Sequence, residues 1–311
     1  MTSDKRTAVC CLSSLNLDKY DEWKDSGLVK DLVRLLDNVL EYFIRLAPPV
    51  LSKAVYSASM ERSIGIGTLG WHSYLQKHGI PFESGGFDSA AQHTNILYSG
   101  IKQQAEDASK ELALTRGEAQ DCVGSGFRNA HLLSIAPNAS SADIVGVSPS
   151  VEPWAGNAFN NQGRAGSFLI KNKYLEKELD KIGLNTKEVW DSIIANEGSC
   201  QHIAELDDHA KKVFKTAREI NPMWIIELAS LRQQYVCQSQ SINIFVPEDI
   251  TMQEMADIHI AAWKKGLKSL YYCRAKAAGK VSVGTGGETP LNSIQVRQKI
   301  EWAGECLSCE G

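Results

Sequence analysis

The stretch RNAHLLSIAPNASSADIVGVSPSVEP, residues 128–153, is the part of the sequence from which the fold and the function can be inferred. Its short apolar run, Leu132–Ala136, has the length of a buried strand. Pro137 and Asn138 interrupt that run, and Asn138 is suited to cap a helix that begins in the small-residue segment 139–142. The stretch therefore predicts a strand, a tight turn and a helix start in immediate succession.

A junction of this kind can hold an anion. The first amide groups of a helix have no partner inside the helix, and small side chains let a phosphate approach them. Ser140 and Ser141 add hydroxyl donors at the same place. Taken alone, however, an ordinary strand-to-helix connection is the favoured interpretation, because short serine-rich turns are common.

Outward from this stretch, apolar periodicity predicts alternating strands and helices, and hence an α/β fold with about five parallel strands. The predicted extended segments are 7–17, 132–136, 165–170, 241–245 and 267–273. The predicted helices cover 28–46, 88–114 with Asp88 as N-cap, 175–199, a helix led into by 207–216, 221–239 with an Asn-Pro start, and 251–266 with a Thr251/Glu254 capping box. So few strands indicate half of a larger closed structure.

Three glycines, Gly65, Gly67 and Gly70, precede an amphipathic segment that ends at Gly79. They look like a phosphate-binding glycine loop, but their spacing does not fit a dinucleotide fingerprint and no strand-like run comes directly before them. We expect close helix packing or a loop near the active site to account for them.

Composition excludes several classes of protein. With 311 residues, 43% apolar and 23% charged, the chain can bury a large core. A net charge of −4 gives no indication of a nucleic-acid or membrane partner. The first residues lack the apolar centre of a signal peptide and no apolar run reaches spanning length, so a cytoplasmic location is the default expectation.

Eight cysteines are too few for a disulfide-built secreted fold. Two pairs stand out, Cys10-Cys11 near the start and Cys306-x-x-Cys309 at the end. The second pair is preceded by a segment rich in Gly, Thr, Ser and Pro, 279–292, that is typical of a flexible linker. Buried core thiols are the alternative for the first pair. A zinc site is the alternative for the second, disfavoured because no second CxxC or close histidine pair accompanies it, and no metal site is predicted.

Taken together, the motifs resemble the C-terminal half of the large, catalytic subunit of class I ribonucleotide reductase. The resemblance runs from residue 7 to residue 311 and rests on several motifs in the family's order. They are AVCCLSSLNL at 8–17, RSIGIGTLG at 62–70, the stretch at 128–153, LKSLYYCR at 267–274 and CLSC at 306–309. Such an order is far more specific than any one motif.

The resemblance implies roles for the cysteines. Cys10, and not Cys11, matches one thiol of the redox pair that reduces the substrate. Cys306 and Cys309 match the tail dithiol that re-reduces this pair by thiol–disulfide exchange and is itself reduced by thioredoxin or glutaredoxin. A stand-alone thiol oxidoreductase is a weaker interpretation, because no thioredoxin-like βαβ pattern surrounds the CxxC motif.

The resemblance also implies roles for the tyrosines and for the loop. Tyr271 and Tyr272 match the stacked radical-transfer pair that receives the radical from a metal-containing small subunit; without the family, they would be strand aromatics on opposite faces. This chain would bind no cofactor itself. The diphosphate of a ribonucleoside diphosphate would lie on the loop, where Ala139 replaces a glutamate common in the family, so that backbone and hydroxyl groups make the contact. The implied loop residues are Pro137, Asn138, Ala139, Ser140 and Ser141.

The family's thiyl-radical loop, with the pattern Asn-x-Cys-x-Glu, does not occur in this sequence. The expected architecture is therefore half of a ten-stranded α/β barrel over residues 1–275, completed by another polypeptide, followed by a redox tail over 276–311. A split gene with the N-terminal half of the large subunit on a separate chain would explain this. The alternative is a non-catalytic relic or a binding protein for the small subunit, which would have no need of the thiols.

Overall fold

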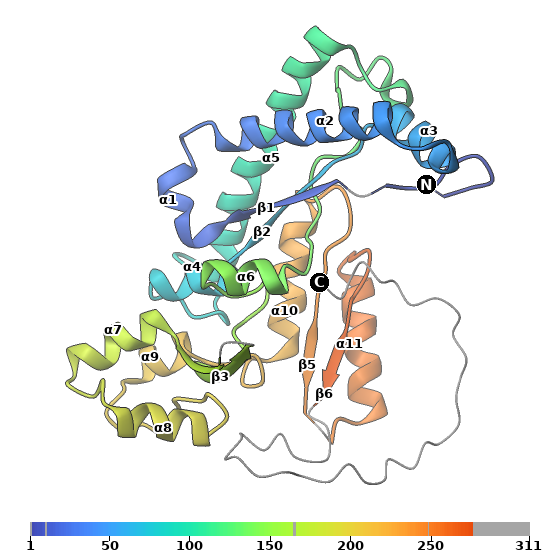
Figure 1. Cartoon of the computed structure of the whole chain (residues 1–311). Helices are drawn as coiled ribbons and strands as arrows, with labels where there is room; N and C mark the ends of the chain where they lie inside the picture. Colours follow the sequence, from blue (N-terminus) through green and yellow to red (C-terminus); the bar gives the residue numbers. More distant parts are fainter. Residues whose placement is uncertain (1, 10, 164–165, 248, 276–311) are drawn as a thin grey trace.

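The computed structural model describes residues 2–9, 11–163, 166–247 and 249–275 (Figure 1). Six strands are assigned, namely β1 Leu12–Asn16, β2 Gly65–Leu69, β3 Ala158–Gly163, β4 Gly166–Lys171, β5 Ile244–Val246 and β6 Cys273–Ala275. The helices are α1 Tyr20–Trp23, α2 Leu28–Leu46, α3 Ser52–Glu61, α4 Trp71–Lys77, α5 Ala90–Arg116, α6 Ala139–Val145, α7 Lys173–Lys181, α8 Lys187–Ala195, α9 Asp208–Val213, α10 Pro222–Gln233 and α11 Met252–Lys264.

Parallel pairing joins the described strands in sequence order except for β3 and β4, which pair antiparallel, so the predicted parallel strand at 165–170 was wrong in its pairing. β1 pairs with β2 in parallel. A parallel bridge between Ile66 and Leu133 then joins β2 to the extended residues 132–136. A second parallel bridge joins Ile135 to Gln240. β5 and β6 then pair in parallel. Bridged backbone therefore connects the N-terminal strand pair to the C-terminal one.

These contacts confirm the α/β class but not the details of the sheet. The described residues form three two-stranded sheets and no closed sheet. The predicted strand at 132–136 is extended and buried, but only Leu133 and Ile135 make bridges. Half of a ten-stranded barrel, completed by another polypeptide, stays a prediction.

The glycine segment is a strand, so the expectation of helix packing or a loop was wrong. β2 is buried along its whole length, and a Cβ atom at Gly65 would lie 2.9 Å from the Cβ atom of Ser134. At Gly67 it would overlap the carbonyl oxygen of Ser134. Glycine is required here because two neighbouring backbones approach closely, a reason that periodicity alone does not reveal.

The helix prediction at 28–46 is confirmed residue for residue by α2, which packs against α5. The predicted start of α5 was wrong, because Ser89 rather than Asp88 is the N-cap and accepts a hydrogen bond from the Gln92 amide. Asp88 instead has φ +47° and contacts the His93 ring nitrogen. The predicted Asn221 cap and the Thr251/Glu254 capping box are both present.

A second hydrophobic cluster lies apart from the main core. It is built by the β3–β4 hairpin and by α7, α8 and α9, with Trp190, Leu175 and Leu179 at its centre. The single helix predicted over 175–199 is therefore two helices. The chain enters and leaves this cluster where the Ala217 amide donates to the Trp154 carbonyl oxygen (2.7 Å). The cluster also contacts the main body, because Asn172 Nδ2 donates to Gln76 Oε1 (2.9 Å) and Lys173 Nζ donates to Asp18 Oδ2 (2.7 Å).

The last predicted strand, 267–273, was placed too early, since β6 begins only at Cys273. The Tyr271 amide nevertheless donates to Ile242 (2.9 Å), and the Ile244 amide donates to Tyr272 (2.8 Å). The backbone at 271–272 is thus already hydrogen-bonded to residues 242–244 before the regular strand β6 begins. The predicted tail over 276–311 lies outside the described residues.

Candidate active site at the loop 137–153 and the tyrosine pair

The predicted turn at Asn138 is present, but its side chain does not cap α6. Asn138 has φ +56° and stands at the N-cap position without a capping hydrogen bond. The side-chain nitrogen of Asn138, Nδ2, donates instead to Ser14 Oγ (2.9 Å) and to the Thr68 carbonyl oxygen (3.3 Å). Asn138 therefore fastens the turn to the carboxyl ends of β1 and β2, where it is held in a left-handed conformation that asparagine tolerates.

The three residues after the turn are open to a ligand. Ala139, Ser140 and Ser141 form the first turn of α6 and are exposed, whereas Pro137 is half-buried. Their position combines short side chains, two hydroxyl groups and the amides of a helix start. This arrangement can accept a phosphate, and substrate binding by residues 137–141 stays a prediction.

The middle of the loop is anchored on the start of α4. The Gly70 amide donates to the Ser148 carbonyl oxygen (2.8 Å), and the Ser148 amide donates to Ser73 Oγ (2.8 Å). Ser150, with φ +47°, accepts a bond from the Trp71 amide through its carbonyl oxygen. Ser148 and Ser150 are fully buried, so the loop has a fixed path from its exposed start to its end at Glu152.

Glu152, to which the sequence motifs assign no role, lies at the end of this loop. Its side chain is buried, and its Oε1 accepts a hydrogen bond from Asn243 Nδ2 (2.7 Å). Burial raises the pKa of Glu152, an effect that the Asn243 amide and the charge of Arg274 oppose. The sequence offered two indications, a carboxyl group at the end of a Gly-, Ser- and Pro-containing turn and an asparagine inside a strand of β-branched residues.

The tyrosine pair lies beside this carboxyl group. The rings of Tyr271 and Tyr272 are 4.2 Å apart between centroids, with their planes inclined by 49°. They are therefore in contact, but tilted rather than stacked in parallel. Asn243 Oδ1 accepts the Tyr272 amide (3.1 Å), and the Arg274 guanidinium lies 5.6 Å from the Tyr272 ring centroid.

The predicted redox cysteines Cys10, Cys306 and Cys309 lie outside the described residues. Cys11 is described, and its Sγ lies 3.6 Å from the Leu36 carbonyl oxygen of α2, packed against the main core. The assignment of Cys10 rather than Cys11 as the redox thiol stays a prediction.

A cavity of about 400 Å³ opens at the amino ends of the parallel stretches. The Ser63 hydroxyl and His131 Nδ1 are 2.8 Å apart at its wall, and Cys237 Sγ accepts the Leu132 amide (3.2 Å). Its walls are formed by Ala8, Val9, Glu61, Ser63, His131, Ser134, Cys237, Gln238, Ser239 and Lys268. The cavity lies next to the residues that precede Cys10 in sequence.

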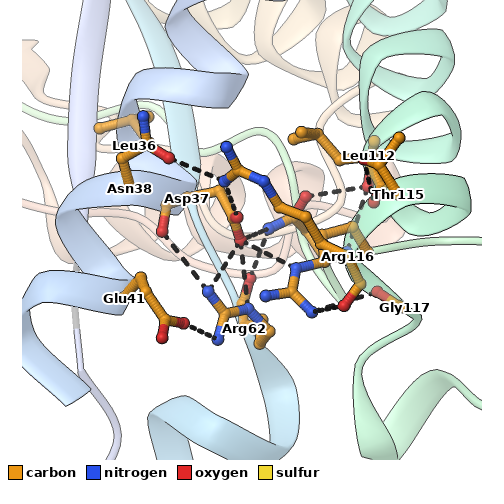
Figure 2. A network of polar contacts seen from close by, with 12 residues as sticks. Leu36, Asp37, Asn38, Glu41, Arg62, Leu112, Thr115, Arg116 and Gly117 are labelled. Carbon is orange, nitrogen blue, oxygen red and sulfur yellow. Dashed lines mark hydrogen bonds and ion pairs between the residues drawn. The ribbon is translucent and has the colours of Figure 1, made fainter. Parts of the chain in front are cut away.

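A buried ion cluster joins helix α2 to the end of α5 (Figure 2). Asp37, with no exposed side-chain surface, accepts bonds from Arg62 Nε (3.1 Å), Arg116 Nη1 (2.7 Å) and Arg128 Nε (3.3 Å). Burial disfavours the charged carboxylate, but the three guanidinium groups outweigh it and hold the pKa of Asp37 below its usual range. The cluster ties α2, through Asp37, to the end of α5, through Arg116.

Among the described residues, no helix is long and apolar enough to cross a membrane. In the same residues, no group of three or more His, Cys, Asp or Glu side chains could hold a metal ion.

Comparisons with known proteins agree with these features. The family profile described as "Ribonucleotide reductase, barrel domain" matches residues 1–125 and 119–273. The ribonucleoside-diphosphate reductase large subunit of Invertebrate iridescent virus 3 is 45% identical over 315 residues, and that of Invertebrate iridescent virus 6 is 48% identical over 282 residues. These alignments cover 100% and 88% of this chain.

A solved structure extends the likeness to three dimensions. The Actinobacillus ureae class Id ribonucleotide reductase alpha subunit superimposes with a TM-score of 0.82 and 42% identity over 89% of this chain. The chain spans only 51% of that protein, and 48% and 29% of the two viral large subunits. With the family profile matched over residues 1–273, this chain belongs to the barrel-domain family of the ribonucleotide reductase large subunit.

Proposed function

We propose that this chain supplies the C-terminal half of the catalytic barrel of a class I ribonucleotide reductase, which reduces ribonucleoside diphosphates to deoxyribonucleoside diphosphates. The observation that carries the proposal is the family match over residues 1–273, which includes both the candidate phosphate loop and the tyrosine pair. The geometry supports it, because Asn243 lies between the end of that loop and the tyrosines.

The net reaction replaces a ribose C–OH bond with a C–H bond. Two thiols supply the two electrons, and a disulfide and water are formed with the substrate hydroxyl. In the proposal Cys10 is one of these thiols, while the second thiol and the radical cysteine come from residues outside this chain. Holding both thiols against the ribose makes the reduction an intramolecular step.

The substrate diphosphate is held by the start of α6. Ala139 offers no carboxylate, so the anion meets only amides and the hydroxyl groups of Ser140 and Ser141. Asn138 is engaged with β1 and β2, and its part in the proposed site is to fix the turn. Pro137 ends the buried stretch before it.

Tyr271 and Tyr272 pass an electron and a proton between the substrate site and a small subunit. The contact of the two rings supports this role, because transfer between them needs close approach. The small subunit, with its metal centre, is the source of the radical, and this chain contributes no cofactor of its own in the proposal.

Cys306 and Cys309 return the oxidised thiol pair to its reduced form. The exchange proceeds through a mixed disulfide and leaves the tail oxidised, to be reduced by thioredoxin or glutaredoxin. The proposed linker at 279–292 gives the tail its reach.

The rest of the barrel is contributed by residues outside this chain, so the chain alone is inactive. The described strands support this, because they form no closed sheet. In the proposal those residues lie on a separate polypeptide, as a split gene requires. A non-catalytic protein that binds the small subunit is the second candidate.

Co-purification tests the proposal. The tagged chain is expressed with the neighbouring genes of its source, and the captured proteins are identified and assayed for reduction of ribonucleoside diphosphates. Capture of a polypeptide with an Asn-x-Cys-x-Glu loop, with activity only in the mixture, supports a split enzyme. Capture of a small subunit alone, without activity under reducing conditions, favours the binding protein.

A further inference from the structure

We propose that Glu152 and Asn243 form a positioning bridge that couples the candidate substrate loop to the tyrosine pair. The inference rests on the proposed function and adds to it two residues that the sequence analysis did not assign. Neither touches the reacting atoms, so both act through the position of Tyr272.

The bridge is a single asparagine side chain bonded on both sides. Asn243 Nδ2 donates to Glu152 Oε1 (2.7 Å), and Asn243 Oδ1 accepts the Tyr272 backbone amide (3.1 Å). Asn243 is 3% exposed and Glu152 is 7% exposed, so water does not readily replace either bond. A buried amide in this position specifies one geometry, because losing either partner leaves a buried polar group unsatisfied.

Both ends of the bridge are held. On the loop side, Ser148 and Ser150 fix the backbone just before Glu152 through their bonds to α4. On the other side, the Tyr271 amide donates to the Ile242 carbonyl oxygen, and the Ile244 amide donates to the Tyr272 carbonyl oxygen. A displacement of the loop is therefore transmitted to Tyr272 rather than absorbed at the ends.

The charges around the bridge reinforce it. Arg274 is the cation whose field acts on Glu152, and the same guanidinium lies over the Tyr272 ring. The carboxylate and the aromatic ring thus share one cation. The Tyr271 ring contacts the Tyr272 ring, so the position of Tyr272 determines the contact between the two rings.

The experiment places a single 3-fluorotyrosine at position 272 of the full chain and records its 19F spectrum with and without the remaining half of the large subunit. Three variants test the bridge. Glu152→Ala removes the acceptor, Glu152→Asp shortens it by one methylene, and Glu152→Gln keeps an oxygen for Asn243. Glu219→Ala is the matched control, a part-buried glutamate that accepts bonds from Ser199 and from the Thr216 amide, away from the tyrosines.

We expect Glu152→Ala and Glu152→Asp to shift and broaden the 272 resonance, with Glu152→Gln and Glu219→Ala unchanged. Asn243→Ala should give the same displaced resonance, and adding Glu152→Ala to it should have no further effect. In active enzyme, kcat for Glu152→Ala should fall by about 100-fold with KM nearly constant, because misplacement by about 1 Å has such an effect. Glu152→Gln should restore kcat.

Identical spectra for Glu152→Ala, Glu152→Gln and the control would overturn the bridge, as would additive effects in the double variant. The outcome is separable from that of the proposed function. If the assembled unaltered protein reduces no ribonucleotide, the proposed function fails, whereas the 19F comparison still decides whether Glu152 positions Tyr272. Glu152→Asp and Glu152→Gln keep the test usable if the alanine variant does not fold.

Discussion

The Tyr271 and Tyr272 rings contact each other although the two residues are neighbours in sequence, with centroids 4.2 Å apart. Consecutive residues of a regular strand point to opposite faces, which would separate the rings. The pair escapes this rule because β6 begins only at Cys273, so residues 271 and 272 lie before the regular strand. A departure from strand geometry is thus what brings the two phenols together.

Tyr271→Phe should abolish turnover while leaving assembly intact. Phenylalanine keeps the ring and its contact with Tyr272 but removes the hydroxyl group that releases the proton during transfer. Activity is measured by deoxyribonucleotide formation and assembly by analytical ultracentrifugation with the small subunit. A fully active Tyr271→Phe enzyme would remove this residue from the radical-transfer pathway.

Asp37→Asn should lower the free energy of unfolding by about 3 kcal/mol, because it removes the charge that pairs with two buried arginines, Arg62 and Arg128, and with the more exposed Arg116. The control is Asp31→Asn on the same helix, an exposed residue 3.6 Å from Arg34, which should change stability by less than about 1 kcal/mol. Urea unfolding at pH 7 measures both. Equal effects of the two variants would contradict a structural role for the cluster.

The Asp37 cluster also predicts the direction of a pH dependence. The arginines lower the pKa of Asp37 in the folded state, so its contribution is fully present above the unfolded-state value of about 3.9 and is lost as the pH falls through the folded value. The stability difference between the unaltered chain and Asp37→Asn should therefore be constant from pH 7 to about 5 and shrink below that. A difference that grows on acidification would contradict this sign.

Gly67→Ala should destabilise the chain by about 1–3 kcal/mol, because the added methyl group meets the Ser134 backbone, which cannot rotate away. Gly100→Ala is the matched control. It lies within α5 with nothing inside 4 Å of its added Cβ atom, and it should stabilise by about 0.5–1 kcal/mol. Opposite signs in thermal unfolding are the expected result, and a neutral Gly67→Ala would contradict the close approach of the strands.

Cys10→Ser and Cys306→Ser should both prevent repeated turnover with thioredoxin or glutaredoxin. A small dithiol bypasses the tail, so it should restore turnover to Cys306→Ser but not to Cys10→Ser. The assay counts deoxyribonucleotides formed per enzyme with each reductant. Equal recovery of the two variants would show that Cys10 is not one of the reducing thiols.

Local patterns predicted the parts of the fold that local physics determines. The whole of α2 followed from its apolar spacing, and the Asn221 and Thr251 caps followed from side chains that bond within their own first turn. The Asp88 cap failed because Ser89, the next residue, also offers an oxygen and wins the position. Propensity alone does not choose between adjacent capping residues.

Long-range contacts set what the sequence did not reveal. Gly65 and Gly67 form a strand because Ser134, nearly seventy residues later, lies against them. In the candidate site, the loop and the tyrosines were identified by resemblance, whereas Glu152 and Asn243 emerged only once the distance between their side chains was known. Neither residue belongs to a short motif with a chemical meaning.

The closure of the chain at Trp154 and Ala217 has a consequence for how this protein can vary. Everything between these two residues carries its own apolar centre around Trp190 and contacts the main body through Lys173, whose ammonium pairs with Asp18, and through His209, whose ring bonds the Gly79 carbonyl oxygen. Insertions or deletions that keep these contacts can therefore change the length of the lobe without altering the spacing of the strands that carry the loop and the tyrosines.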